Sequence, residues 1–174
     1  MITKNFKVFI ACILQSSGNT TTKGYMPVKD VSGTTKYLGF NFASFPYNLY
    51  RNVTFSNGSG IIVGNGDTPA TEDDYALESK ITSGLTASNS TYTFGVDDGN
   101  PYLEYLFTLT NTTGADIVVK EIGYVQPLQS ATTSGGNASS SGNYLIDRTV
   151  LSTPVTVPAN GSAAIKYRLK TVIS

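Results

Sequence analysis

Apolar and polar residues alternate along two segments in the second half of the chain. Between Tyr102 and Thr110 the odd-numbered positions from 103 to 109 are apolar, and Glu104 and Thr108 lie between them. Residues 165–170 repeat the pattern, with apolar residues at 165, 167 and 169 and basic residues between them. A period of two is the signature of a β-strand with one buried face. Both segments are therefore predicted to be half-buried strands.

Further strands are predicted where short apolar or β-branched runs lie between turn residues. Together with the two alternating segments, the predicted strands are residues 60–64, 80–87, 91–96, 102–111, 116–126, 143–151, 155–157 and 163–172. Residues 97–101, 111–114 and 158–161 are rich in the Gly, Asn and Pro that connect strands in hairpins. Short strands at this spacing favour an all-β fold, an antiparallel β-sandwich of the jelly-roll or immunoglobulin-like type.

The first residues have a helical period instead. Apolar residues at positions 2, 6, 9, 10 and 13 lie on one side of a helix, Thr3 can cap its start, and Gly18 can end it. Residues 1–18 are thus predicted to form a short amphipathic helical arm. Its apolar stripe must be covered either by the chain's own sheet or by a neighbouring subunit, and the sequence leaves both open.

Residues 19–59 are predicted to form an extended, aromatic-rich segment in front of a β-sandwich domain at residues 60–174. Extended pieces are expected at residues 25–29 and 36–42, with a turn at 31–35. An aromatic cluster either packs in a core or offers a platform to a partner. Its members are Phe40, Phe42, Phe45, Tyr47 and Tyr50.

Residues 129–141 contain almost nothing that a hydrophobic core could bury, since Ser, Thr and Gly dominate them. They are predicted to form a flexible projecting loop between two strands. Such a loop is either a spacer or a recognition element.

The charge of the chain narrows the class of partner. Its 12 Lys and Arg residues balance 12 Asp and Glu residues, so the chain offers no broad basic surface to a nucleic acid. Charged residues make up 14% of the chain, against about 25% in typical soluble domains, which suits packed assemblies. No segment approaches the roughly 20 apolar residues of a transmembrane helix, and the first apolar run is short for a signal peptide. We expect neither a nucleic acid nor a membrane as partner.

Several common chemistries are excluded by composition. The chain has no histidine, which removes imidazole general bases and the usual zinc sites. Its single cysteine, Cys12, excludes an intrachain disulfide, and apolar neighbours predict a buried structural thiol. Gly64 and Gly66 are not followed by the Gly-Lys-Ser/Thr of a phosphate-binding loop, and they predict a turn.

The carboxylates are the remaining candidates for chemistry. Residues 72–74 and 97–100 supply hard oxygen ligands for calcium, but their spacing matches no EF-hand, and helix-capping and turn roles account for them. Glycoside cleavage would need a pair from Glu78, Glu104 and Glu121, none of which has an identifiable partner in the sequence. We predict no catalytic, cofactor-binding or metal-binding residues, no cofactor and no enzyme activity.

Three phrases stand out along residues 60–173. The first is a Gly-x-Gly-(Asp/Thr)-Thr-Pro-x-Thr-x-Asp-Asp-Tyr-x-Leu-Glu pattern at residues 64–78. The second is Val119-Lys-Glu-Ile-Gly-Tyr124, after a strand of the Phe-Thr-Leu-Thr-Asn type, and the third is residues 148–162 with the final strand. In this order they resemble the phrases of a group of small virion structural proteins of tailed bacteriophages.

The resemblance implies a component of a phage particle, in the head or the tail. We expect a capsid decoration or auxiliary head protein, or a tail or collar component, that is present in the virion in many copies. Its partners would be other virion proteins and copies of itself. The alternative is a receptor-binding or adhesion module that contacts host surface glycan through residues 129–141 and exposed tyrosines, and a virion depolymerase comes third.

Overall fold

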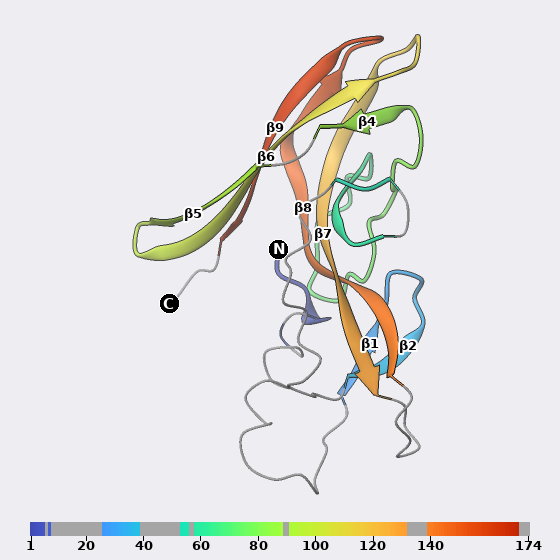
Figure 1. The fold of residues 1–174 in the computed structure, drawn as a ribbon, viewed down its shortest axis with the longest axis vertical. Helices are drawn as coiled ribbons and strands as arrows, with labels where there is room; N and C mark the ends of the chain where they lie inside the picture. The colour runs from blue at the N-terminus through green and yellow to red at the C-terminus, as the bar shows by residue number, and fades with distance from the viewer. Residues whose placement is uncertain are drawn as a thin grey trace, which may run out of the picture.

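The protein is built of antiparallel β-strands (Figure 1). The computed structural model describes residues 1–5, 7, 26–38, 53–55, 58–88, 91–131 and 139–170. Within these ranges the strands form a two-stranded hairpin, a three-stranded sheet and a second, larger sheet. The predicted all-β, antiparallel fold is confirmed.

Each sheet has a simple strand order. The hairpin pairs β1 (Met26–Lys29) with β2 (Thr35–Leu38). In the three-stranded sheet, β7 (Ile117–Ala131) lies between β3 (Gly60–Gly64) and β8 (Ser139–Val157). In the larger sheet, β6 (Asn100–Asn111) is central, with β4 (Leu85–Ala87) and β5 (Thr91–Asp97) along one edge and β9 (Ser162–Lys170) along the other.

The two larger sheets share one hydrophobic core. Its fully buried members include Ile61, Val63, Leu109, Val119, Tyr144 and Val157. The Tyr105 ring of β6 stacks on Tyr124 of β7 at a centroid distance of 5.7 Å and on Tyr167 of β9 at 6.4 Å. Aromatic pairs of this kind contribute about 0.5–1.5 kcal/mol beyond the burial of their area. The tyrosine stack therefore ties one sheet to the other at the centre of the core.

The predicted strands agree with the structure where the alternating pattern is strong. Strands β6 and β9 bury the apolar face that the period of two marks. The predicted strands 143–151 and 155–157 are one strand, β8, because β7 pairs with it on both sides of residues 151–154. Register shifts between Val119 and Glu121, and between Tyr124 and Val125, interrupt this long ladder and bend it. Of the predicted strand 80–87, only Leu85–Ala87 forms a strand, and Lys80 makes an isolated β-bridge.

The prediction of a flexible loop over residues 129–141 is wrong at both ends. Strand β7 continues to Ala131 and β8 begins at Ser139, so that Gln129 pairs with Ser141. The ladder is made by backbone groups, and polar side chains do not interrupt it. Composition alone therefore underestimates the length of these two strands. Residues 132–138 lie outside the described part of the chain.

The predicted N-terminal helix is not supported by the described residues. Ile2 forms a β-bridge with Asp147, and the Thr3 N–H donates to the Ile146 carbonyl oxygen at 3.0 Å. Within the described part of the arm, helical backbone is confined to Lys4, Asn5 and Lys7. The edge of β8 offers hydrogen bonds to the start of the chain, and an apolar period in the sequence cannot reveal such an edge.

The turn predicted at residues 31–35 is confirmed. Asp30 Oδ1 accepts hydrogen bonds from the backbone N–H groups of Ser32 and Thr34, both at 3.0 Å, and Gly33 has a φ of 81°. Cys12, the aromatic cluster at residues 40–50 and the rest of the arm lie outside the described residues. The domain boundaries at 18/19 and 59/60 stay predictions. In the described ranges, no helix has the length and apolar character needed to span a membrane.

Candidate functional site

The 65–79 loop is the most distinctive feature beside the sheets. It leaves the end of β3 and returns to it, since Gly64 forms a β-bridge with Lys80 and the Asn65 N–H donates to the Ser79 carbonyl oxygen at 2.8 Å. A loop whose ends meet in this way is a compact Ω-loop. It covers the second face of the three-stranded sheet, where Leu77 packs with Ile62, Val125 and Leu145 in a small apolar cluster.

Arg148 of β8 fixes this loop to the sheet. Its guanidinium is 3% exposed, and Nε donates to Glu121 Oε2 of β7 at 2.8 Å. Nη1 donates to Asp74 Oδ2 at 2.8 Å, and Nη2 donates to the Thr68 carbonyl oxygen at 3.1 Å. One cation thus binds the neighbouring strand and two separate points of the loop.

Glu121 binds the same loop through its backbone. The carboxylate is fully buried and accepts hydrogen bonds from the N–H groups of Gly66 at 3.2 Å, Glu78 at 3.2 Å and Ser79 at 2.8 Å. With Arg148 it has four donors. An ion buried without partners costs several kcal/mol, and here the hydrogen bonds compensate that cost. The loop therefore has a defined base rather than a loose attachment.

The two glycines of the first phrase are required by this close approach. A Cβ on Gly66 would lie 2.7 Å from Glu121 Oε1, and a Cβ on Gly64 would lie 2.6 Å from the Ser79 carbonyl oxygen. Real Cβ atoms do not come so close to their neighbours, so larger residues would push the loop off the carboxylate. The Gly-x-Gly pattern thus allows the backbone of the loop to approach the Glu121 carboxylate closely.

The ion pairs hold these groups in their charged forms. Burial opposes ionisation of Asp74, but hydrogen bonds from Arg148 and Thr71 outweigh it and lower the pKa of Asp74. Burial also opposes the charge on Arg148, yet Asp74 and Glu121 raise the pKa of its guanidinium. Within the loop, hydrogen bonds from the Thr68 hydroxyl and N–H lower the pKa of Glu78. Asp74, Glu78 and Arg148 are therefore held in their charged forms near neutral pH.

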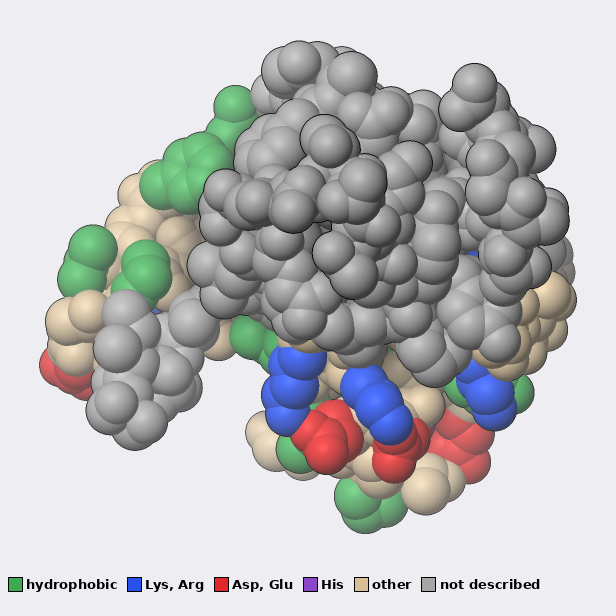
Figure 2. All heavy atoms as spheres, turned by 90° about the horizontal axis from the view of Figure 1, so that it is seen from below, with side chains coloured by type: hydrophobic (Ala, Val, Ile, Leu, Met, Phe, Trp, Pro, Cys, Tyr) green, Lys and Arg blue, Asp and Glu red, His purple; other side chains and the backbone are tan. Residues whose placement is uncertain are grey.

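The acidic run at residues 72–74 does not converge on one point. Glu72 pairs with Lys7, Asp73 lies 3.6 Å from Lys4 Nζ, and Asp74 binds Arg148. Figure 2 shows basic and acidic side chains side by side on this end of the molecule. In the part of the chain that the structure describes, no group of three or more Cys, Asp or Glu residues is placed to hold a metal ion.

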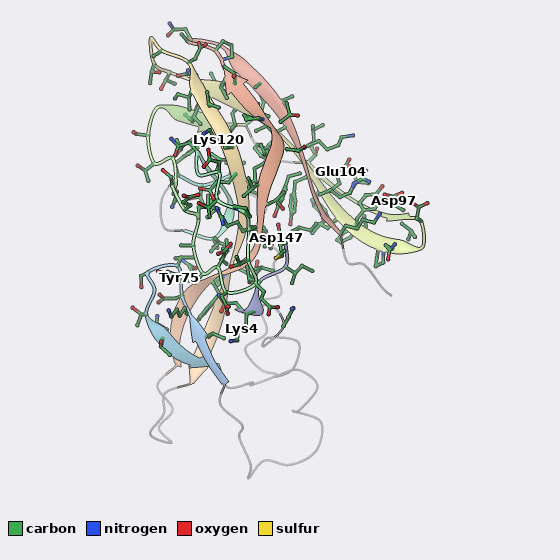
Figure 3. The ribbon with its side chains drawn as sticks, turned by 180° about the vertical axis from the view of Figure 1, so that it is seen from behind. Lys4, Tyr75, Asp97, Glu104, Lys120 and Asp147 are labelled. Carbon is green, nitrogen blue, oxygen red and sulfur yellow. The ribbon has the colours of Figure 1, made fainter. Side chains whose placement is uncertain are left out.

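The three glutamates considered for glycoside cleavage are divided between two places. Glu78 and Glu121 both lie at Arg148, which the sequence did not reveal because the three residues are far apart along the chain. Glu104 lies on the hairpin formed by β5 and β6 and pairs with Arg168 at 2.7 Å (Figure 3). Since Glu121 is fully buried and already bound by four donors, this arrangement does not present it to a substrate.

A groove of about 300 Å³ lies between the loop and the β1–β2 hairpin. Its lining includes Lys4, Asn5, Val28, Lys29, Asp73 and Tyr75. The Tyr75 ring is 37% exposed, and Lys29 Nζ lies 5.1 Å from its centroid. Figure 3 shows Lys4 and Tyr75 beside the hairpin. Sequence analysis missed this groove, because its walls come from three separate segments.

Comparison with known proteins does not assign the chain. No protein family matches it, and neither a curated protein nor a solved structure is significantly similar to it.

Proposed function

We propose that the chain is a non-enzymatic structural protein of a tailed-bacteriophage virion, present in many copies and bound to other virion proteins and to copies of itself. It would be a capsid decoration or auxiliary head protein, or a tail or collar component. The observation that carries the proposal is the contact between the three phrases of the resemblance. The first phrase, residues 64–78, makes up nearly all of the 65–79 loop, Glu121 belongs to the second phrase, and Arg148 opens the third. The phrases thus form one interacting unit, which supports treating the resemblance as that of a whole module.

The physical character of the unit also supports this function. Fully satisfied polar networks hold a protein in one conformation, and a subunit of a symmetric particle must present the same surface in every copy. The same proposal takes the two larger sheets as a β-sandwich of the jelly-roll or immunoglobulin-like type, supported by their shared core. Jelly-roll sandwiches are frequent in viral capsid proteins.

Mass spectrometry of gradient-purified particles tests the location. Particles of the phage that encodes the chain should contain its peptides in a fixed, high ratio to the major capsid protein. Immunogold labelling with antibody to the purified chain should then mark either the head or the tail. A chain that is abundant in lysates and absent from purified particles would contradict the proposal.

The groove beside Tyr75 favours a second candidate, a receptor-binding module that contacts host surface glycan. Glycan recognition combines an aromatic surface with nearby polar groups, and Tyr75 lies among Lys4, Asn5 and Asp73. Binding of the full chain to an array of host surface glycans tests this second candidate. Tyr75→Ala should abolish binding, while Phe94→Ala, which removes an exposed aromatic ring on another element, should not. Equal binding by both variants would reject the groove as the glycan site.

A further inference from the structure

The first residues of the chain lie along the edge of β8, and we call them the strap (residues 1–5 and 7). The Thr3 N–H donates to the Ile146 carbonyl oxygen at 3.0 Å. In the other direction, the Arg148 N–H donates to the Met1 carbonyl oxygen at 3.1 Å. Hydrogen bonds in both directions are those of an antiparallel strand pair. The strap is therefore attached to the sheet through its backbone.

Two buried polar side chains of the strap add to this attachment. Thr3 is fully buried, and its hydroxyl donates to the Leu145 carbonyl oxygen of β8 at 2.6 Å. Asn5 is also buried, and its Nδ2 donates to the Lys29 carbonyl oxygen of β1 at 2.9 Å. A buried polar group is costly without a hydrogen-bond partner, and both of these groups have one. The strap thus connects β8 with the β1–β2 hairpin.

The strap also binds the 65–79 loop. The Lys4 N–H donates to the Glu72 carbonyl oxygen at 2.6 Å. Lys4 Nζ lies 3.6 Å from Asp73 Oδ1, and the Lys7 ammonium pairs with the Glu72 carboxylate. The hydrogen bond from Lys7 lowers the pKa of Glu72, so this carboxylate stays charged near neutral pH. The loop therefore has a second attachment, separate from the one at Glu121.

The groove beside Tyr75 depends on the strap for one of its walls. Lys4 and Asn5 line the groove, and the β1–β2 hairpin and the loop supply its other walls (Figure 3). Asn5 binds the hairpin and Lys4 binds the loop, so the strap joins these two walls to each other. If the strap left its place, the groove would lose one wall and the connection between the other two.

We infer that the strap controls the opening of the 65–79 loop: the loop leaves β8, and the groove opens, only when the contacts between the strap and residues 72 and 73 break. The ion pairs in these contacts are exposed, so each is weak and is screened by salt. The contacts of the strap with β8 are buried and are not screened in this way. The loop side of the strap is therefore the side that opens first.

This control links the groove to the loop. A ligand that needs all three walls would bind the closed form alone, and it would slow the opening of the loop in turn. The inference concerns contacts within one chain, so it does not depend on the location of the protein in a virion.

Hydrogen exchange of the full chain, followed residue by residue by NMR, tests the inference. A double variant with Lys4→Ala and Lys7→Ala removes both exposed ion pairs of the strap and no buried group. The readout is the exchange of the three loop N–H groups that are bonded to Glu121 rather than to the strap. They should exchange about 2- to 10-fold faster than in the wild type, since exposed pairs contribute modestly to stability. The β6–β9 ladder should keep its wild-type rates, which shows that the effect is local.

Lys166→Ala is the matched control. Lys166 is 63% exposed and lies 3.7 Å from Glu104 Oε1, and Lys4 is 66% exposed and lies 3.6 Å from Asp73 Oδ1. Loss of the Lys166 pair, which lies on the larger sheet, should leave exchange in the loop unchanged.

Added salt gives a second readout without a substitution. Higher ionic strength should speed exchange of the three loop N–H groups in the wild type, and less so in the double variant, which lacks the two screened pairs. Faster exchange confined to the strap and to residues 72 and 73, with the N–H groups at Glu121 unchanged, would overturn the inference, because the loop would then open without the strap. Loop rates equal to those of the wild type, or an equal salt response in both chains, would overturn it as well.

Discussion

Arg148 Nε donates a hydrogen bond to Glu121 Oε2 at 2.8 Å, and both side chains are at most 3% exposed. The two residues lie on neighbouring strands, and each also binds the 65–79 loop. Removing one of them leaves the charge of the other buried, which is far more costly than losing an ion pair in water. The stability of the loop is therefore concentrated in this pair.

Glu121→Ala should be strongly destabilising. The change removes one of the carboxylates that compensate the buried charge of Arg148. It also removes the acceptor of three backbone N–H groups. Breaking a buried pair in this way typically lowers the free energy of unfolding by about 3–5 kcal/mol. Urea denaturation of the variant and the wild type measures the loss. Lys120→Ala, next to it on β7, removes only an exposed ion pair with Asp67 and should change stability little. Similar losses in both variants would show that the buried pair does not stabilise the loop.

Acid should weaken the attachment of the loop through Asp74. Its pKa is lowered in the folded chain from an ordinary value of 3.8, because hydrogen bonds from Arg148 and Thr71 outweigh burial. The resulting stabilisation is fully present above pH 3.8, the ordinary pKa of the group. It is lost as the pH falls through the lower pKa that Asp74 has in the folded chain. Denaturation midpoints followed through this range should fall less steeply for Asp74→Asn than for the wild type. Asp73→Asn, beside exposed Lys4, is the control, and a slope for Asp74→Asn equal to that of the wild type would reject this role.

Gly66→Ala should destabilise the protein because the loop cannot accommodate a side chain there. The new Cβ would lie 2.6 Å from Glu78 Cβ and 2.7 Å from Glu121 Oε1. Overpacking of this kind costs about 1–3 kcal/mol. At Gly114 a Cβ would meet nothing within 4 Å, so Gly114→Ala should stay within about 0.5 kcal/mol of the wild type. Thermal unfolding of the two variants separates the outcomes, and equal melting temperatures would contradict the proposed fit.

Alkaline pH should destabilise the core through Tyr167. Burial raises its pKa well above 10.0, and the neighbouring charge of Asp147 adds to the shift. The stabilisation from a neutral Tyr167 is fully present below the unfolded value of 10.0 and is lost as the pH rises toward the folded one. Tyr167→Phe removes a 2.6 Å hydrogen bond to Asp147, costs about 1.5–3 kcal/mol at neutral pH, and should flatten the decline above pH 10.0. If the stability of Tyr167→Phe declined as steeply above pH 10.0 as that of the wild type, ionisation of other groups would cause the decline.

The strands could be predicted from the sequence better than the attachment of the 65–79 loop. Strands β6 and β9 follow from a period of two, which is a local property of the chain. The loop is attached through Asp74, Glu121 and Arg148, and these three residues are far apart in the sequence. The one usable signal is Arg148 itself, a cation within the predicted strand 143–151, because a charge in a buried strand needs a partner. The helix predicted for residues 1–18 is not supported by the described residues, and the β-bridge that Ile2 makes to the edge of β8 could not be predicted for the same reason, since that edge is remote in sequence.

The way Glu121 collects its donors has a consequence for hydrogen exchange. The N–H groups of Gly66, Glu78 and Ser79 all bind the same carboxylate, so none of them can open fully while the other two hold it in place. Their exchange with deuterium should therefore occur in one concerted opening of the whole loop, at a free energy below that of the β7–β8 ladder. A single side chain thereby makes a segment without a strand ladder of its own behave as one cooperative unit.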